Sequence, residues 1–285
     1  MAAAPYALLA TLAFALGTTL QQRGALQTEA SATQARFYVQ IFTRKAWLLG
    51  GLFQILGGVL QLVALAHGPL VVVEPILAFN LVFALPLGHW LTAQEVRRRQ
   101  VTGACVVTFG VVAFVVIGQP EGGSATPTTA RWLVVTLLVV VAGAGCLLAA
   151  RGRSAAVVAG LVGGAAGIAF GFEAAIAKEF THVFGIGISH TLTHWSTYAL
   201  IVIALVGSVL EQASLKAGVL PPAMAALGVL SLLVGVALGV ALFGDRLAHE
   251  PAGVFAGALA LAITVVGLIV LVRPTAHVAA ADRPA

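Results

Sequence analysis

Three carboxylates lie inside long apolar runs of the sequence: Glu74, Glu173 and Glu211. An ionisable side chain inside a membrane is costly, and by default it marks a transport pathway. Pro75 follows Glu74 at once and frees a backbone carbonyl in the preceding turn. Glu74 is therefore expected to carry a proton or to hold a transported cation. A neutral acid that is hydrogen-bonded across helices is the structural alternative.

Polar and small residues also recur at helical spacing in two of the apolar runs. One stripe is Gly50, Gln54, Gly58 and Gln61, and the other is Gly207, Ser208, Glu211 and Ser214. Residues three or four apart share a helix face, and a polar stripe on an apolar span should face protein or water. The two stripes therefore predict a shared cavity. Helix packing with glutamine hydrogen bonds is the alternative interpretation.

The candidate pathway residues combine the carboxylates with the amides near them. The predicted set is Glu74, Gln61, Gln54, Asn80, Glu173, Glu211 and Gln212. No nucleophile elbow or catalytic-triad order is found, so catalysis is not expected. His190 and His194 have the spacing of a metal pair but no third ligand. With His182 they are predicted to be solvated histidines of an external loop, and neither a metal site nor a cofactor is expected.

The composition determines the solvent of this chain. Of 285 residues, 60% are hydrophobic and 9% are charged, against about 25% charged in soluble domains. The mean hydropathy is +1.04, so lipid must surround the protein. The net charge of +5 does not indicate nucleic acid, because the basic residues are scattered without interleaved aromatics. Cys105 and Cys146 form no metal-type spacing and are expected to pack within helices.

Nine apolar runs are long enough, or nearly so, to cross a bilayer, which takes about 20 helical residues. They are Ala4–Leu20, Trp47–Ala66, Pro69–Leu91, Val101–Gly118, Trp132–Ala150, Ala155–Ala177, Tyr198–Leu215, Pro221–Phe243 and Gly253–Val272. No alternating pattern of a membrane barrel is found. The predicted fold is an all-α polytopic bundle. Met1–Gln22 lacks a basic region before its apolar stretch, so it is expected to be a retained helix.

The basic residues predict an orientation, because Lys and Arg favour cytoplasmic loops. With the N-terminus outside, twelve of the 15 lie in cytoplasmic segments: Arg23, Arg36, Arg44, Lys45, Arg97, Arg98, Arg99, Arg151, Arg153, Lys216, Arg273 and Arg283. Arg131, Lys178 and Arg246 fall outside. The prediction is a plasma-membrane protein of a prokaryote-like cell with a cytoplasmic C-terminus. Ala30–Trp47 is expected to form an interfacial helix, with a short extra span as the alternative.

The chain divides into two related halves. Residues 1–118 form a first membrane repeat, 119–153 an external linker with a fifth span, 154–273 a second repeat, and 274–285 a cytoplasmic tail. Gln61–Leu65 ends a helix before Gly68 in one half, as Glu211–Leu215 does before Gly218 in the other. With one odd helix between them, the halves must be inverted. Inverted repeats build alternating-access transporters with the site near the midplane.

These features resemble the drug/metabolite transporter (EamA-like) superfamily. The resemblance rests on Ala64–Gly110, with its Gln94-Glu95-Val96 helix exit, and on Leu215–Leu247. Nine spans and Gln21-Gln22-Arg23-Gly24 are similar to the NIPA-like magnesium-transporter branch, which implies Mg²⁺ as a cargo. That branch places an acidic residue in the second helix, where this chain has Gly58. Fold alone does not specify the substrate.

The resulting hypothesis is a secondary transporter of small neutral or cationic metabolites or drugs, with proton coupling through Glu74 or Glu211. Phosphorylated substrates are disfavoured, because they usually need buried basic partners. A Mg²⁺ transporter and a non-transporting membrane scaffold remain alternatives. The expected partners are the substrate and the lipid bilayer, not nucleic acid, and a homodimer is left open.

Overall fold

The computed structural model describes residues 2–26, 43–92, 96–123, 125–216, 220–246 and 251–272. Within these ranges all regular elements are helical, apart from one isolated bridge between Glu121 and Arg246. Among the described residues, nine spans are long and apolar enough to cross a membrane. The predicted all-α bundle with about nine spans is therefore confirmed. The predicted interfacial helix at Ala30–Trp47 falls mostly outside the described residues.

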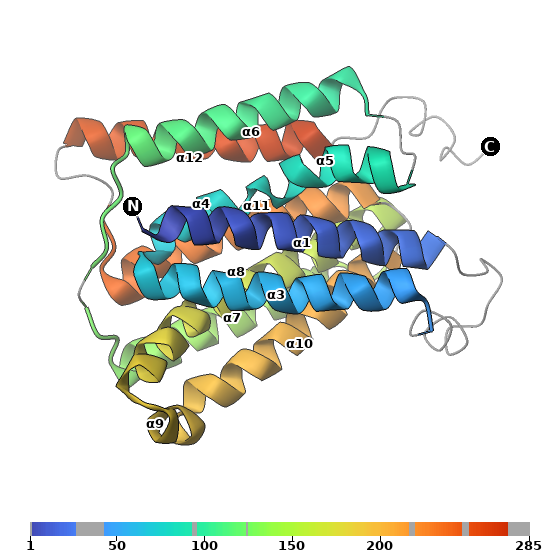
Figure 1. The fold of residues 1–285 in the computed structure, drawn as a ribbon. Helices are drawn as coiled ribbons and strands as arrows, with labels where there is room; N and C mark the ends of the chain where they lie inside the picture. The colour runs from blue at the N-terminus through green and yellow to red at the C-terminus, as the bar shows by residue number, and fades with distance from the viewer. Residues whose placement is uncertain are drawn as a thin grey trace.

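Figure 1 shows the arrangement of the helices. Their bounds are α1 Ala3–Leu26, α3 Lys45–His67, α4 Leu70–Leu77, α5 Phe79–Thr92, α6 Arg98–Val116, α7 Thr129–Ala149, α8 Ala155–Ile186, α9 Ile188–Thr193, α10 Trp195–Lys216, α11 Leu220–Leu238, the π-helix η1 Gly239–Phe243, and α12 Pro251–Val272. The third span consists of α4 and α5, and the eighth of α11 and η1.

We call the end of the bundle where α3 turns into α4 the hairpin end, and the opposite end, where α1 ends and α3 begins, the basic end. The hairpin end lies at the left of Figure 1, together with the linker between α6 and α7. The basic end carries Arg44, Lys45 and Arg97–Arg99 next to its helix termini. Both names describe the molecule alone and imply no side of a membrane.

Helix packing follows the same scheme in the two halves. In the first half α1 packs against α3 and α5, and in the second half α8 packs against α10 and α11. Across the halves α6 packs against α12, and α4 against α11. Four spans lie between α1 and α8, so these equivalent helices run in opposite directions. This matching scheme of contacts is the one expected of two inverted repeats.

The close contact between α8 and α11 depends on glycine. A Cβ added at Gly163 or Gly167 would overlap the α11 backbone at Ala223 or Leu227. A Cβ at Gly171 would come within 2.7 Å of Val234 Cβ. Small residues let membrane helices approach until their backbones touch. The sixth span therefore approaches α11 closely through these glycines.

Two spans depart from a straight α-helix. The third span has Pro75 inside α4 and breaks at Ala78, between α4 and α5. The eighth span ends in η1, and Gly244, with a φ of 69°, turns the chain out of the helix. Proline removes one helical hydrogen bond, and π-turns inside helices occur frequently at functional sites. Glu74 lies next to Pro75 in the first of these segments, and Asp245 follows Gly244 after the second.

The sixth span is longer than the sequence predicts. Helix α8 continues nine residues past Ala177, to Ile186, and so contains Lys178 and His182. The expectation that His182 lies in a loop is wrong. Charged and polar residues after Ala177 lower the hydropathy there, but the backbone stays helical, and Lys178 binds the carbonyl oxygens of Leu65 and Gly68.

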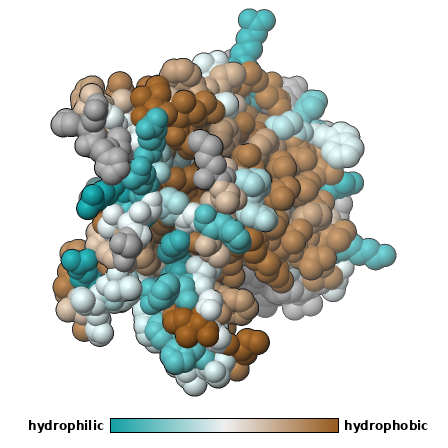
Figure 2. Space-filling view, turned by 60° about the vertical axis from the view of Figure 1, so that its left-hand side comes forward, coloured by the Kyte–Doolittle hydropathy of each residue, from teal (hydrophilic) through white to brown (hydrophobic). Residues whose placement is uncertain are grey.

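The lateral surface of the bundle is apolar. Large apolar side chains that point outward are numerous on α7 and α10, among them Leu133, Leu137, Leu138, Ile201 and Val202. Figure 2 shows a broad brown flank beside a region where hydrophilic residues gather. In water such a surface would drive aggregation, whereas lipid tails cover it at no cost.

Candidate functional site

One large cavity, of about 950 Å³, lies within the helix bundle. Its wall is formed by α1, α3, α4, α5, α8, α10 and α11, with one residue of α12. All seven residues that the sequence singles out line it: Glu74, Gln61, Gln54, Asn80, Glu173, Glu211 and Gln212. The two halves of the chain therefore contribute to one chamber.

Glu74 is the most enclosed acid of this cavity. Its side chain is 4% exposed, and a Cβ on Gly235 of α11 would lie 2.5 Å from its Cγ. Its carboxyl group is close enough to that of Glu173, on α8, for the two to interact electrostatically. No hydrogen bond from the described residues reaches the Glu74 carboxyl. Two acids from opposite halves thus line the same cavity, and no described Lys or Arg lines it with them.

Amide groups surround the acids. The Oδ1 atom of Asn80 is buried and has no hydrogen-bond partner, and Gln61 is buried on α3. Gln54 donates through Nε2 to Oγ1 of Thr18 at 3.2 Å. A buried carbonyl oxygen without a donor is costly, so Asn80 offers an acceptor that a ligand or water could satisfy.

The predicted stripes divide between the cavity and helix packing. Gln54, Gly58 and Gln61 line the cavity, as do Ser208 and Glu211. The other members make helix contacts. Gly50 touches Gly17 and Gln21 of α1, Gly207 faces the ring of Phe170, and Ser214 donates to the backbone carbonyl of Glu211. The shared cavity and the packing alternative are thus each correct for different residues.

The cavity reaches toward one end of the bundle only. Gln21, Trp47 and Leu215 line it near the basic end. Toward the hairpin end, its last lining residue on α4 is Glu74, four residues after the start of that helix at Leu70, or about 6 Å at helical rise. Beyond it, Leu65, Leu70 and Val71 are completely buried. The hairpin end is closed by packed side chains.

Several lining residues were not predicted. Thr18 and Gln21 of α1 are spaced like the other polar stripes, and this spacing could have identified them. Phe14, Trp47 and Phe170 add an aromatic part to the wall. Isolated aromatics in apolar runs carry no signal in the sequence. In the described part of the chain, none of the lining residues is Lys or Arg.

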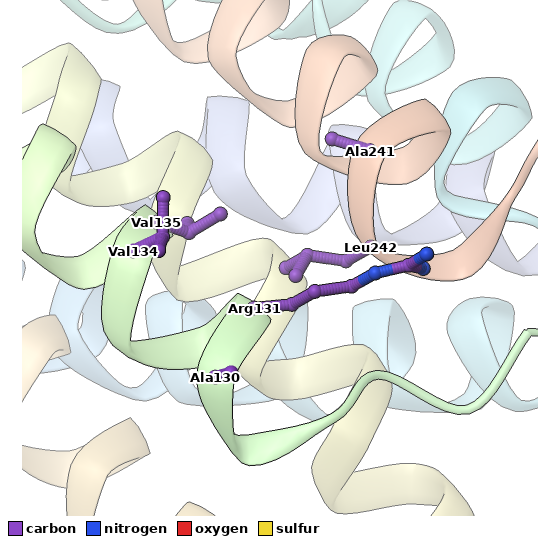
Figure 3. A pocket seen from close by; sticks show the side chains of 6 residues that line it. All are labelled: Ala130, Arg131, Val134, Val135, Ala241 and Leu242. Atoms are coloured by element: carbon purple, nitrogen blue, oxygen red, sulfur yellow. The ribbon is translucent and has the colours of Figure 1, made fainter.

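The histidines and a second pocket lie apart from this cavity. His190 is on the short helix α9 and His194 follows it, with Nδ1 2.9 Å from Oγ of Ser196. Among the described residues no three His, Cys, Asp or Glu side chains group together as for a metal. Figure 3 shows the second pocket, about 370 Å³ in volume, where Arg131 extends from α7 toward η1. Its other lining residues are all apolar.

Gly235 provides a test of whether the position of the Glu74 carboxyl matters. A methyl group at 235 would lie 2.5–2.8 Å from three atoms of the Glu74 side chain and would displace them. We expect Gly235→Ala to lower solute-driven transport by about tenfold, the effect of losing one well-placed charged hydrogen bond. Flux into proteoliposomes measures it.

Gly228→Ala is the matched control for this variant. Gly228 also lines the cavity from α11, but a methyl there meets only the end of the Leu81 side chain, at 3.3 Å. Equal flux in the two variants, with equal melting temperatures, would show that the carboxyl position has no role.

The nine spans define the class: an integral membrane protein built as an α-helical bundle. Neither a family model nor a solved structure matches the chain. An uncharacterized protein of Corynebacterium glutamicum is 30% identical over 283 residues, which cover 98% of this chain and 97% of that protein. The chain belongs to the same family as that protein. The similarity includes both halves and hence both walls of the cavity.

Proposed function

We propose that the protein is a secondary transporter that moves small neutral or cationic solutes across the membrane by alternating access. The observation that carries this proposal is the cavity of about 950 Å³ between the two halves, which is lined by three acids and closed at the hairpin end. A scaffold has no need of such a chamber. An intramembrane acid without a basic partner favours a cationic cargo or a proton.

The lining also bears on the kind of solute. Phe14, Trp47 and Phe170 offer apolar and π surface, while Glu74 and Glu173 supply negative charge deeper in the cavity. An organic cation could place its apolar body against the rings and its charge near the acids. With the basic end in the cytoplasm, as the loop charges favour, the cavity is in its inward-open state.

Mg²⁺ is the second candidate cargo. The oxygen atoms of Glu74, Glu173, Gln61 and Asn80 are of the type that Mg²⁺ prefers. Gly58 lines the cavity without a carboxylate, and a Cβ there would meet open space. The acid that the NIPA-like branch carries at this position is therefore missing from the wall, which favours an organic solute over the metal.

Reconstitution in proteoliposomes separates these functions. One internal dye reports Mg²⁺, another reports pH, and a panel of organic amines and neutral metabolites is added outside. We expect proton movement that depends on an organic solute. Mg²⁺ uptake without proton movement would instead favour the metal transporter. No flux of any ion or solute, with the fold verified by its melting transition, would contradict transport.

A further inference from the structure

Lys178 connects the two halves at the hairpin end. It lies on α8 in the second half, and its Nζ donates to the carbonyl oxygens of Leu65, at 2.5 Å, and Gly68, at 2.7 Å, in the first half. These carbonyls belong to the last turn of α3 and the residue after it. Carbonyl groups at a helix C-terminus lack partners within the helix and attract positive charge. Lys178 thus caps α3 from the other half.

Asp245 makes a complementary contact with Val71, which lies three residues after Gly68. It follows η1 in the second half, and its Oδ2 accepts from the backbone N–H of Val71 at 3.2 Å. Val71 lies in the first turn of α4, whose N-cap residue Pro69 provides no side-chain cap. A carboxylate at a helix N-terminus is stabilising. Asp245 therefore caps α4 from the other half.

The linker between α6 and α7 also binds Asp245 and the residue after it. Oδ1 of Asp245 accepts from the N–H of Gly123 at 2.9 Å. Glu121 and Arg246 exchange two backbone hydrogen bonds of 2.9 Å each. Burial raises the pKa of the Asp245 carboxyl, while the N–H groups of Gly123 and Val71 and the nearby Lys178 ammonium act to lower it. Asp245 is 3% exposed, so these contacts are shielded from water.

We propose that Lys178 and Asp245, with the backbone groups of Leu65, Gly68, Val71 and Gly123 that they bind, form a latch that holds the hairpin end closed and breaks when the cavity opens there. This inference rests on the proposed alternating-access function. We call the set the hairpin latch.

The position of the latch supports this role. The Lys178 bonds and the bond from Val71 to Asp245 run from one half to the other, so a rocking motion of the halves must break them. At the same end Leu65, Leu70 and Leu242 are completely buried, and none of them lines the cavity. Water would take the place of both caps once the end opens. The net cost of breaking these bonds is then modest, as a reversible step requires.

The test measures access to the cavity and needs no knowledge of the solute. Ser231 lines the cavity on α11, so Ser231→Cys reports access in a background with Cys105→Ala and Cys146→Ala. A membrane-impermeant methanethiosulfonate reagent is applied to vesicles of each orientation. In the parent we expect labelling from the basic end only. In Lys178→Met and in Asp245→Asn we expect labelling from the hairpin end to be about tenfold faster.

Glu179→Gln is the matched control, since it neutralises the neighbouring residue of α8 outside the cavity and the latch. A merely structural role for Lys178 and Asp245 would lower the melting temperature and leave the side of labelling unchanged. That result in both variants would overturn the proposal. If the flux assays fail while labelling changes sides as expected, the proposed function is at fault and the gating contacts stand.

A covalent lock gives an independent measurement. A Cβ at Gly239 would lie 3.4 Å from Cβ of Leu70, across the two halves, close to the roughly 3.5–4.5 Å of a disulfide. Oxidation of the pair Leu70→Cys and Gly239→Cys is expected to stop transport, and reduction to restore it. Gly239→Cys alone controls for crowding against Asp245, whose Oδ2 would be 2.9 Å away. Undiminished transport with the disulfide formed would overturn the latch.

Discussion

Glu74→Gln is expected to reduce solute-driven transport about 100-fold, in line with the cost of removing one partner from a buried charge interaction. Glutamine keeps the size of the side chain and its contact with Gly235, but it can neither release a proton nor hold a cation. The Glu74 carboxyl is buried, faces Glu173 and has no donor among the described residues. Under the proposed function, the Glu74 carboxylate therefore pairs with a bound ligand or a proton.

The measurement is flux into proteoliposomes, with proton movement followed at the same time. Glu179→Gln serves as the control, because it removes an acid from the same bundle at a position that does not line the cavity. Glu211→Gln should reduce flux less, since Glu211 lies nearer the basic end, one turn from Leu215. Full transport by Glu74→Gln would remove it from the pathway and leave the structural interpretation of a neutral acid.

Gly167→Ala is expected to destabilise the protein more than any other change discussed, by about 1–3 kcal/mol or more. The added methyl would overlap the carbonyl oxygen of Leu227 in the α11 backbone. A backbone cannot move aside as the end of a flexible side chain can, so α8 and α11 must separate. These two helices carry Glu173 on one side and Ser231 on the other, so the cavity would be distorted as well.

Gly160→Ala is the comparison for this prediction. Gly160 lies seven residues earlier on α8, and its added methyl would make an ordinary contact of 3.7 Å with Cβ of Pro222. Thermal unfolding in detergent, followed by size-exclusion chromatography, should show a clear loss for Gly167→Ala and little change for Gly160→Ala. Equal melting temperatures for the two variants would mean that the helices do not meet as closely as the structure places them.

The sequence alone determined the solvent, the fold class and the residues worth testing. Apolar runs of about 20 residues must be helices in lipid, because no water is present there to satisfy the backbone. An isolated acid such as Glu74 in such a run is costly enough to be informative. For these reasons nine spans and seven cavity-lining residues could be chosen without coordinates.

The sequence could not distinguish two kinds of small or polar residue on the same face of a helix. Gly58 lines the cavity, whereas Gly50, a member of the same stripe, packs against α1. Spacing along a helix gives a common face, but what lies opposite that face depends on the neighbouring helices. The length of α8 was also missed, since packing keeps Lys178 within the helix although its charge lowers the local hydropathy.

Only the tertiary structure decided which end of the cavity is closed and by what. Lys178 is 110 residues from Gly68, and Asp245 is 174 residues from Val71. Their partners are backbone carbonyl and N–H groups, which every residue except proline carries in the same form. The pattern of side chains in the sequence therefore cannot predict these bonds. The sequence identified three acids in the membrane, and the fold alone brought Glu74 and Glu173 together beneath a closed end.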